Sequence, residues 1–108
     1  MDMTLREVCT ATNVSRRAVQ GYEKAGLVRA SGKTKRGYLI YNEETQERIR
    51  QIKLYQQLGF SIKEITAIID APNEVIKEAL KVQVVKLQEQ GENLEVLIRT
   101  AYELIKKL

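Results

Sequence analysis

Apolar residues in the first 70 positions form short groups at helical spacing, and each group stops at a polar or glycine signal. The first group follows Thr4 and Glu7, a hydroxyl and a carboxylate three residues apart. This pattern is typical of a capping box, in which the two side chains bind free backbone N–H groups at the start of a helix. It predicts a short helix that ends at about Thr12.

A second short helix is predicted after the turn sequence TNVS. Ser15 is a suitable cap for this helix, and Gly26 ends it just after about Ala25. Val19 and Tyr22 are three residues apart, so they share one face, which we expect to be the inner face. Two short helices joined by a brief turn are typical of a helix-turn-helix motif.

The stretch LVRASGKTKRGYLIYN changes the pattern from helical to β. It begins as a strand, passes through a tip rich in glycine and lysine, and returns in the β-type run from Tyr38 to Tyr41. We therefore expect a β-hairpin over residues 28–41, in a chain that otherwise shows helical patterns.

Two further helices are predicted before residue 71. Asn42 is a suitable cap for a helix over about 43–58. Ser61 and Glu64 repeat the capping-box pattern, and they predict a fourth helix that ends at about Asp70.

The apolar pattern becomes a strict heptad repeat in the C-terminal third of the chain. Pro72 breaks the chain, and Asn73 is expected to cap the helix that follows. The apolar positions then alternate in steps of four and three, which favours a left-handed coiled coil over an ordinary surface helix. A helix of about 35 residues is roughly 50 Å long. The members of this seam are Leu80, Val84, Leu87, Gly91, Leu94, Ile98, Ala101, Ile105 and Leu108.

An apolar seam of this length requires a cover, and the simplest cover is the same helix of a second copy. A turn near Gly91 that folds the segment back on itself is the alternative. If the helix continues through Gly91, this glycine either allows two helices to approach closely or only weakens the helix locally. The pattern divides the chain into a first domain over residues 1–71 and a dimerisation helix over residues 72–108.

The composition of the 108 residues excludes several function classes. There is no histidine, which is the commonest general base, and the single cysteine, Cys9, cannot form a disulfide framework or a multi-thiolate metal site. No phosphate-binding loop or nucleophile motif occurs, so we predict no enzyme activity, catalytic residue, cofactor or metal site. No apolar run reaches the roughly 20 residues of a membrane span, and the start of the chain lacks the layout of a secretory signal. We therefore expect a cytoplasmic protein.

Positive charge is concentrated in one part of the chain. The net charge is +4, and residues 1–70 carry twelve Lys and Arg against eight Asp and Glu, whereas residues 71–108 carry six of each. Within residues 15–36, seven cations stand against Glu23 alone. Such a basic segment predicts a polyanionic partner. An ordinary solvated surface is the alternative interpretation.

Three motifs, in the same order and at similar spacings, resemble the MerR family of transcription regulators. They are V-S-x-x-x-x-x-x-Y-E-x-x-G-L from Val14 to Leu27, G-Y-x-x-Y from Gly37 to Tyr41, and L-G-F-S-x-x-E-I from Leu58 to Ile65. The resemblance runs over residues 4–70, and the long heptad helix that follows also resembles the family.

The resemblance implies a mainly α fold, a winged helix-turn-helix with a small β-hairpin wing, followed by a long helix that dimerises as an antiparallel coiled coil. It implies that the helix after Ser15 enters the major groove while the hairpin follows the phosphate backbone. Family members bind inverted repeats in promoters and bend and untwist that DNA, so the implied partners are double-stranded DNA, a second copy and RNA polymerase. The expected DNA contacts are Ser15, Arg16, Arg17, Gln20, Tyr22, Lys24, Lys33, Lys35, Arg36, Tyr38 and Tyr41.

The sequence departs from the family pattern at several of these positions. The family usually has Thr-x-Arg and then an aromatic residue or histidine before Tyr-Glu, whereas Ala18, Gln20 and Gly21 stand here. In the wing, Leu39 replaces the usual arginine of Gly-Tyr-Arg. Gln20 is suited to an adenine edge, and the basic residues of the wing tip are suited to replace the missing charge.

Two other function classes remain open. One is a coiled-coil dimer whose winged domain docks on an acidic protein surface, and the other is an excisionase-like architectural DNA binder. The sequence also leaves open the operator, the choice between activation and repression, and whether an effector-binding domain follows Leu108.

Overall fold

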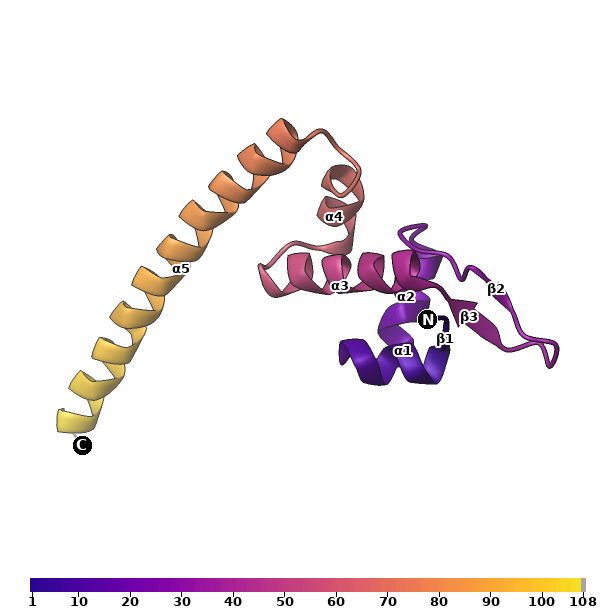
Figure 1. Cartoon of the computed structure of the whole chain (residues 1–108). Helices are drawn as coiled ribbons and strands as arrows, with labels where there is room; N and C mark the ends of the chain where they lie inside the picture. Colours follow the sequence, from indigo (N-terminus) through magenta and orange to yellow (C-terminus); the bar gives the residue numbers. More distant parts are fainter. Residues whose placement is uncertain (108) are drawn as a thin grey trace. The chain divides into compact units, whose positions relative to one another are not determined.

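The computed structural model describes residues 1–107 (Figure 1). The elements follow the order β1, α1, α2, β2, β3, α3, α4 and α5, and the chain separates into two compact units. The first unit is Met1–Asp70, and the second begins at Ala71 and contains α5. The prediction of a mainly helical fold with one small hairpin is confirmed. Within residues 1–107, no helix combines the length and the apolar character that crossing a membrane requires.

The first two helices begin at the predicted caps. α1 spans Leu5–Thr12 and has both halves of the capping box: the Thr4 N–H donates to Glu7 at 3.0 Å, and the Glu7 N–H donates to Thr4 Oγ1 at 3.3 Å. α2 spans Arg16–Lys24. The turn between them contains Asn13 in the left-handed region, with φ of 55°. These two helices are the predicted helix-turn-helix pair.

The sheet contains one strand more than the sequence predicts. β3 (Leu39–Tyr41) lies between β1 (Met3–Thr4) and β2 (Gly32–Lys33), and both pairings are antiparallel. Two residues are too few to show an alternating pattern, so β1 escapes detection in the sequence.

The hairpin is shorter than the predicted range of 28–41, because its first strand begins only at Gly32. Leu27 and Val28 are buried, at 4% and 8% exposed, and they belong to the core of the first unit. Their apolar side chains extend the strand pattern in the sequence. In the structure they pack into the core and do not belong to a strand.

α3 (Glu43–Gln57) and α4 (Ile62–Ile68) complete the first unit. Asn42 caps α3 as predicted, since its Oδ1 accepts from the Thr45 N–H at 2.9 Å. Ser61 and Glu64 form the predicted second capping box. The most deeply buried side chains come from every large element of this unit, and they are Val8, Val19, Tyr41, Ile49, Ile52 and Ile65.

α5 runs without interruption over Asn73–Lys107. The expected cap at Asn73 is wrong by one position, because the Pro72 carbonyl already accepts from the Ile76 N–H at 3.2 Å and Asn73 is itself helical. The alternative turn at Gly91 is also wrong, since the helix continues through this residue. Leu108, the last expected member of the seam, lies outside the described residues.

Candidate nucleic-acid interface

The turn and the inner face of α2 fix which side chains this helix presents to solvent. Ser15 Oγ accepts from the Ala18 N–H at 3.0 Å and holds the first turn of the helix. Val19 and Tyr22, at 0% and 2% exposed, anchor the opposite side in the core. The exposed side of α2 therefore carries four of the predicted DNA contacts and one glycine. These residues are Arg16, Arg17, Gln20, Lys24 and Gly21.

Two of the predicted DNA contacts, Tyr22 and Tyr41, have buried side chains whose hydroxyl groups are bonded within the chain. The Tyr22 hydroxyl donates to Gln56 Oε1 at 2.5 Å, and the Tyr41 hydroxyl donates to Glu23 Oε1 at 2.5 Å. Tyr41 is 0% exposed, and burial raises the pKa of both phenols. We therefore leave Tyr22 and Tyr41 out of the proposed contact surface. Tyr22 connects α2 to α3, and the Tyr41–Glu23 bond connects β3 to α2.

The tip of the hairpin is a tight turn that projects its cations. The Gly37 N–H donates to the Thr34 carbonyl at 2.9 Å, and the Thr34 N–H donates to the Tyr38 carbonyl at 2.8 Å. Gly37 has φ of 84°, a conformation that glycine adopts without steric cost. Lys35 and Arg36 occupy the two central positions of this turn, and both are exposed. A tight turn at this point places them at the outermost part of the wing.

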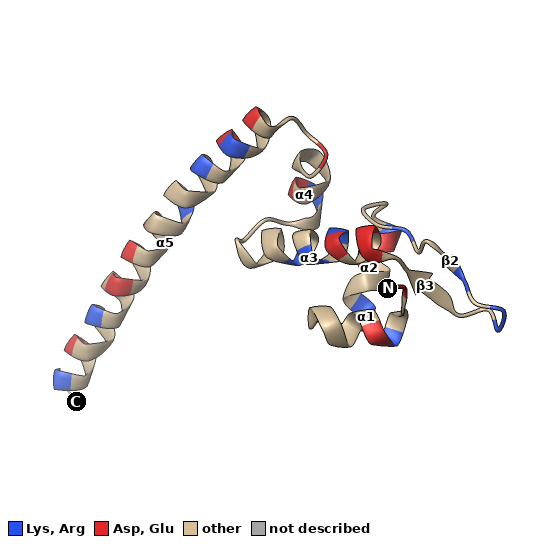
Figure 2. Cartoon of the chain, viewed as in Figure 1, with Lys and Arg blue, Asp and Glu red and all other residues tan. Residues whose placement is uncertain are grey.

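The cations of residues 15–36 have no carboxylate partner within the described part of the chain. The ion pairs of residues 1–107 involve other cations, such as Arg48 and Lys81, and none involves the basic segment. Figure 2 shows the Lys and Arg positions gathered at the wing tip, whereas α5 alternates both signs. The unpaired cations are Arg16, Arg17, Lys24, Arg29, Lys33, Lys35 and Arg36.

One basic residue beside this surface was not predicted from the sequence. Arg6, in the first turn of α1, lines a hollow of about 540 Å³ together with Arg16 and Tyr38. In the sequence, Arg6 stands inside a capping box, far from the basic segment, and no local signal marks it. Only the folding of α1 beside the base of the hairpin brings it to this surface.

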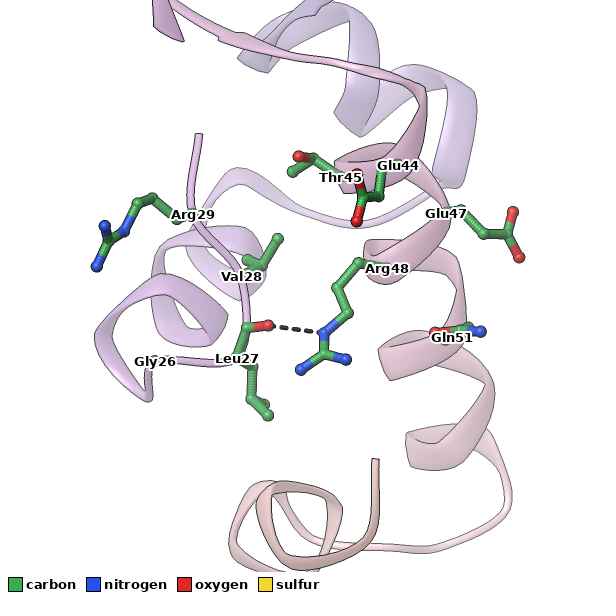
Figure 3. A pocket seen from close by; sticks show the side chains of 9 residues that line it. All are labelled: Gly26, Leu27, Val28, Arg29, Glu44, Thr45, Glu47, Arg48 and Gln51. Carbon is green, nitrogen blue, oxygen red and sulfur yellow. Dashed lines mark hydrogen bonds between the residues drawn. The ribbon is translucent and has the colours of Figure 1, made fainter. Parts of the chain in front are cut away.

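A second hollow, of about 560 Å³, lies between α3 and the segment after α2 (Figure 3). Arg48 reaches across it and donates from Nε to the Leu27 carbonyl at 2.9 Å. Arg48 Nη1 and Nη2 each donate to Asp70, at the end of the first unit. Because all three guanidinium nitrogens of Arg48 already donate a hydrogen bond within the first unit, we interpret this arrangement as structural support for the connection between α2 and the wing.

A helix-turn-helix followed by a basic hairpin defines the winged helix-turn-helix class of domains. Residues 3–72 match the family model described as MerR HTH family regulatory protein, and residues 46–104 match the model described as MerR, DNA binding. The chain therefore belongs to the MerR family, as its motifs predicted. Members of this family are transcriptional regulators, so the prediction that the chain is not an enzyme is confirmed.

Solved structures of this family share the fold. A MerR family transcriptional regulator from Bacillus cereus superposes with a TM-score of 0.88 at 27% identity, over 99% of this chain and 82% of that one. HiNmlR, a MerR family regulator lacking the sensor domain and bound to promoter DNA, gives a TM-score of 0.73 over 100% of this chain and 95% of that one. At 18% identity, that likeness concerns the fold alone.

Relatives of known sequence are longer than this chain. The transcriptional activator mta of Bacillus subtilis is 30% identical over 100 residues, which is 93% of this chain and 39% of mta. NolA of Bradyrhizobium elkanii is 36% identical over 70 residues, which is 65% of this chain and 32% of NolA. The chain thus spans about two fifths of mta and just under a third of NolA.

Proposed function

We propose that this chain is the DNA-binding and dimer-forming part of a transcription regulator that recognises an inverted repeat in promoter DNA. The observation that carries this proposal is the basic segment of residues 15–36, which spans α2, the connection after it and the wing. Its seven cations have no carboxylate partner among residues 1–107. A surface of this kind attracts the phosphate backbone through release of counterions. The match of residues 46–104 to the family model described as MerR, DNA binding supports the choice of duplex DNA as the polyanion.

The two parts of the surface have different tasks in this proposal. The exposed face of α2 is of a size that fits the major groove, and Arg17 and Gln20 are residue types that bind guanine and adenine edges. The wing tip carries Lys33, Lys35 and Arg36 on a turn, where they contact phosphates and position the domain.

The second unit supplies the dimer contact in this proposal. Its seam side chains are open to solvent, with Leu87, Leu94 and Ile105 at 39%, 59% and 64% exposed. A row of exposed apolar side chains this long is typical of an interface rather than of a free surface. Pairing with α5 of a second copy, in antiparallel orientation, covers the seam and matches the two-fold symmetry of an inverted repeat. Distortion of the promoter and contact with RNA polymerase belong to the same proposal, as does a cytoplasmic location.

A titration on selected duplexes tests the proposal. The preferred sequence is first selected from random duplexes with the unmodified protein, and affinities for that operator and for a random duplex are then measured at several salt concentrations. About 6–10 neutralised phosphates per dimer predict an affinity loss of about 10³–10⁵-fold between roughly 50 and 200 mM salt.

The titration tests the first alternative function, and measurements of duplex bending and of transcription from the selected promoter test the second. A winged domain that docks on an acidic protein selects no preferred duplex. An excisionase-like architectural protein bends its duplex but leaves transcription from that promoter unchanged. Either result contradicts the proposal of a transcription regulator.

A further inference from the structure

Three side chains from separate elements meet at the hollow beside the wing. Arg6 comes from the first turn of α1, Arg16 from the first turn of α2, and Tyr38 from the residue just before β3. The rest of the lining is small or apolar and consists of Thr4, Leu5, Gly37 and Leu39. No carboxylate lines the hollow, so its electrostatic character is set by two guanidinium groups.

The polar groups of these three side chains are free to bind a ligand. Arg6 and Arg16 are exposed, and their guanidinium groups have no hydrogen-bond or ion-pair partner among residues 1–107. Tyr38 is 63% exposed, and within the same range its hydroxyl has no partner. The nearest acid in the sequence, Glu7, is already engaged, because its carboxylate accepts from the Thr4 N–H at 3.0 Å. The hollow therefore combines free cationic donors with one free hydroxyl donor.

We infer that this hollow seats one phosphate of the DNA backbone, and that Arg6 is a DNA contact although it lies outside both α2 and the wing. The inference rests on the proposed function. Guanidinium groups bind phosphate through two parallel hydrogen bonds, and a phenol adds a third direction of donation. A backbone strand that passes from the groove occupied by α2 to the wing crosses the junction of these elements. The seat differs from the wing tip, because it has arginine and tyrosine on three elements rather than cations on one turn.

The experiment combines charge removal on the protein with charge removal on single phosphates. The variants Arg6→Ala, Arg16→Ala and the double variant are titrated against the selected operator and a random duplex at several salt concentrations. In a second series, each operator phosphate in turn is replaced by an uncharged methylphosphonate. Arg6→Lys tests the paired geometry, since it keeps the charge but loses the planar fork.

We expect each single variant to weaken both duplexes by a similar factor. The double variant leaves the seated phosphate without a cation, so it should lower the salt slope by about one unit for each protomer. A methylphosphonate at one operator position should weaken binding of the unmodified protein severalfold. The same replacement should not weaken binding of the double variant further, because that variant already lacks the arginines that contact this phosphate. Arg29→Ala is the matched control: it removes one cation of the basic segment that does not line this hollow, and it should keep its full sensitivity at that position.

Three outcomes overturn the inference. If Arg6→Ala binds both duplexes like the unmodified protein while Arg17→Ala binds the operator more weakly, the phosphate seat is wrong and the proposed function stands. If inorganic phosphate shifts the NMR signals of Arg6 and Tyr38 but no single methylphosphonate distinguishes the double variant, the hollow takes only a free anion. If the unmodified protein binds no duplex in a salt-dependent manner, the proposed function itself fails, and the seat fails with it.

Discussion

The guanidinium of Arg48 donates to both carboxylate oxygens of Asp70, at 2.6 Å and 2.8 Å, while its Nε–H donates to the Leu27 carbonyl at 2.9 Å. One α3 side chain thus joins the segment that leads into the wing to the last residue of the first unit. The geometry is the bidentate fork that makes arginine–carboxylate pairs directional. Its effects on stability can be separated from those of ordinary surface ion pairs.

Replacing Asp70 with asparagine should destabilise the protein in a pH-dependent way. Hydrogen bonding to Arg48 holds the pKa of the Asp70 carboxyl below its ordinary value of about 4. The carboxylate therefore contributes fully above that ordinary pKa, and its contribution is lost as the pH falls through the lower pKa of the folded state. Thermal unfolding from pH 7 to pH 3 should show a lower midpoint for Asp70→Asn at pH 7 and a gap that closes in acid.

The control for this prediction is Glu47→Gln. Glu47 forms only a single exposed contact with Arg50, at 3.6 Å within α3, and exposed pairs of this type contribute little. Arg48→Met should lower the free energy of unfolding by about 1–3 kcal/mol more than Asp70→Asn or Glu47→Gln. The reason is that it also leaves the Leu27 carbonyl without its donor. If the difference in unfolding midpoint between Asp70→Asn and the unmodified protein stays constant with pH, the Arg48–Asp70 ion pair is not its cause.

Arg17 and Gln20 should determine sequence preference. They are three residues apart on the exposed face of α2 and so point in similar directions. Alanine at either position should cost about 1–3 kcal/mol on the selected operator and much less on a random duplex. Arg16→Ala is the control on the same helix, and it should weaken both duplexes equally. Equal losses for all three variants would leave α2 as a phosphate anchor.

The wing tip should contribute affinity without sequence preference. Changing Lys33, Lys35 and Arg36 together to alanine should weaken operator and random duplex by similar factors and lower the salt slope by about one unit for each phosphate that no longer meets a cation. A triple alanine variant at Lys77, Lys81 and Lys86 in α5 removes the same charge and should leave the slope nearly unchanged. A wing variant that loses operator preference shows instead that the tip reads bases or groove shape.

The seam of α5 should hold the dimer together. Lysine at both Leu87 and Leu94 places two charges in the proposed apolar contact, so light scattering at micromolar concentration should report a monomer, and tight operator binding should be lost. Lysine at Val82 and Val96 is the matched control, because these residues are also apolar and 55% exposed but lie off the seam. If the unmodified protein is itself a monomer, the seam has another function.

Gly21 should be a position where stability and binding move in opposite directions. It lies inside α2, where glycine costs about 0.5–1 kcal/mol relative to alanine, and an added Cβ meets no atom within 4 Å. Gly21→Ala should therefore raise the free energy of unfolding by about that amount. Because the position lies on the face proposed to enter the groove, the same change should weaken operator binding. Unchanged binding in a stabilised variant places Gly21 outside the DNA contact.

Local signals determined most of the helices before any tertiary structure was known. Capping depends on side chains within three residues of one another, so Thr4 with Glu7 and Ser61 with Glu64 specify two helix starts from the sequence alone. The heptad pattern from Leu80 is equally local, and it predicted one continuous helix over Gly91 as its first interpretation. The charge of the basic segment and the family motifs are likewise properties of the chain itself.

Tertiary structure alone decided which polar side chains are available at the surface. Tyr41 has the same amphipathic chemistry as Tyr38, but only the folded structure buries its ring and bonds its hydroxyl to Glu23. For Tyr22, helical spacing predicted the inner position, and only the folded structure shows the bond of its hydroxyl to Gln56. Arg6 became a surface candidate for the opposite reason, since folding brings α1 beside the base of the hairpin. Burial and long-range hydrogen bonding depend on residues far apart in the chain, and a pattern that repeats every two or four residues carries no information about them.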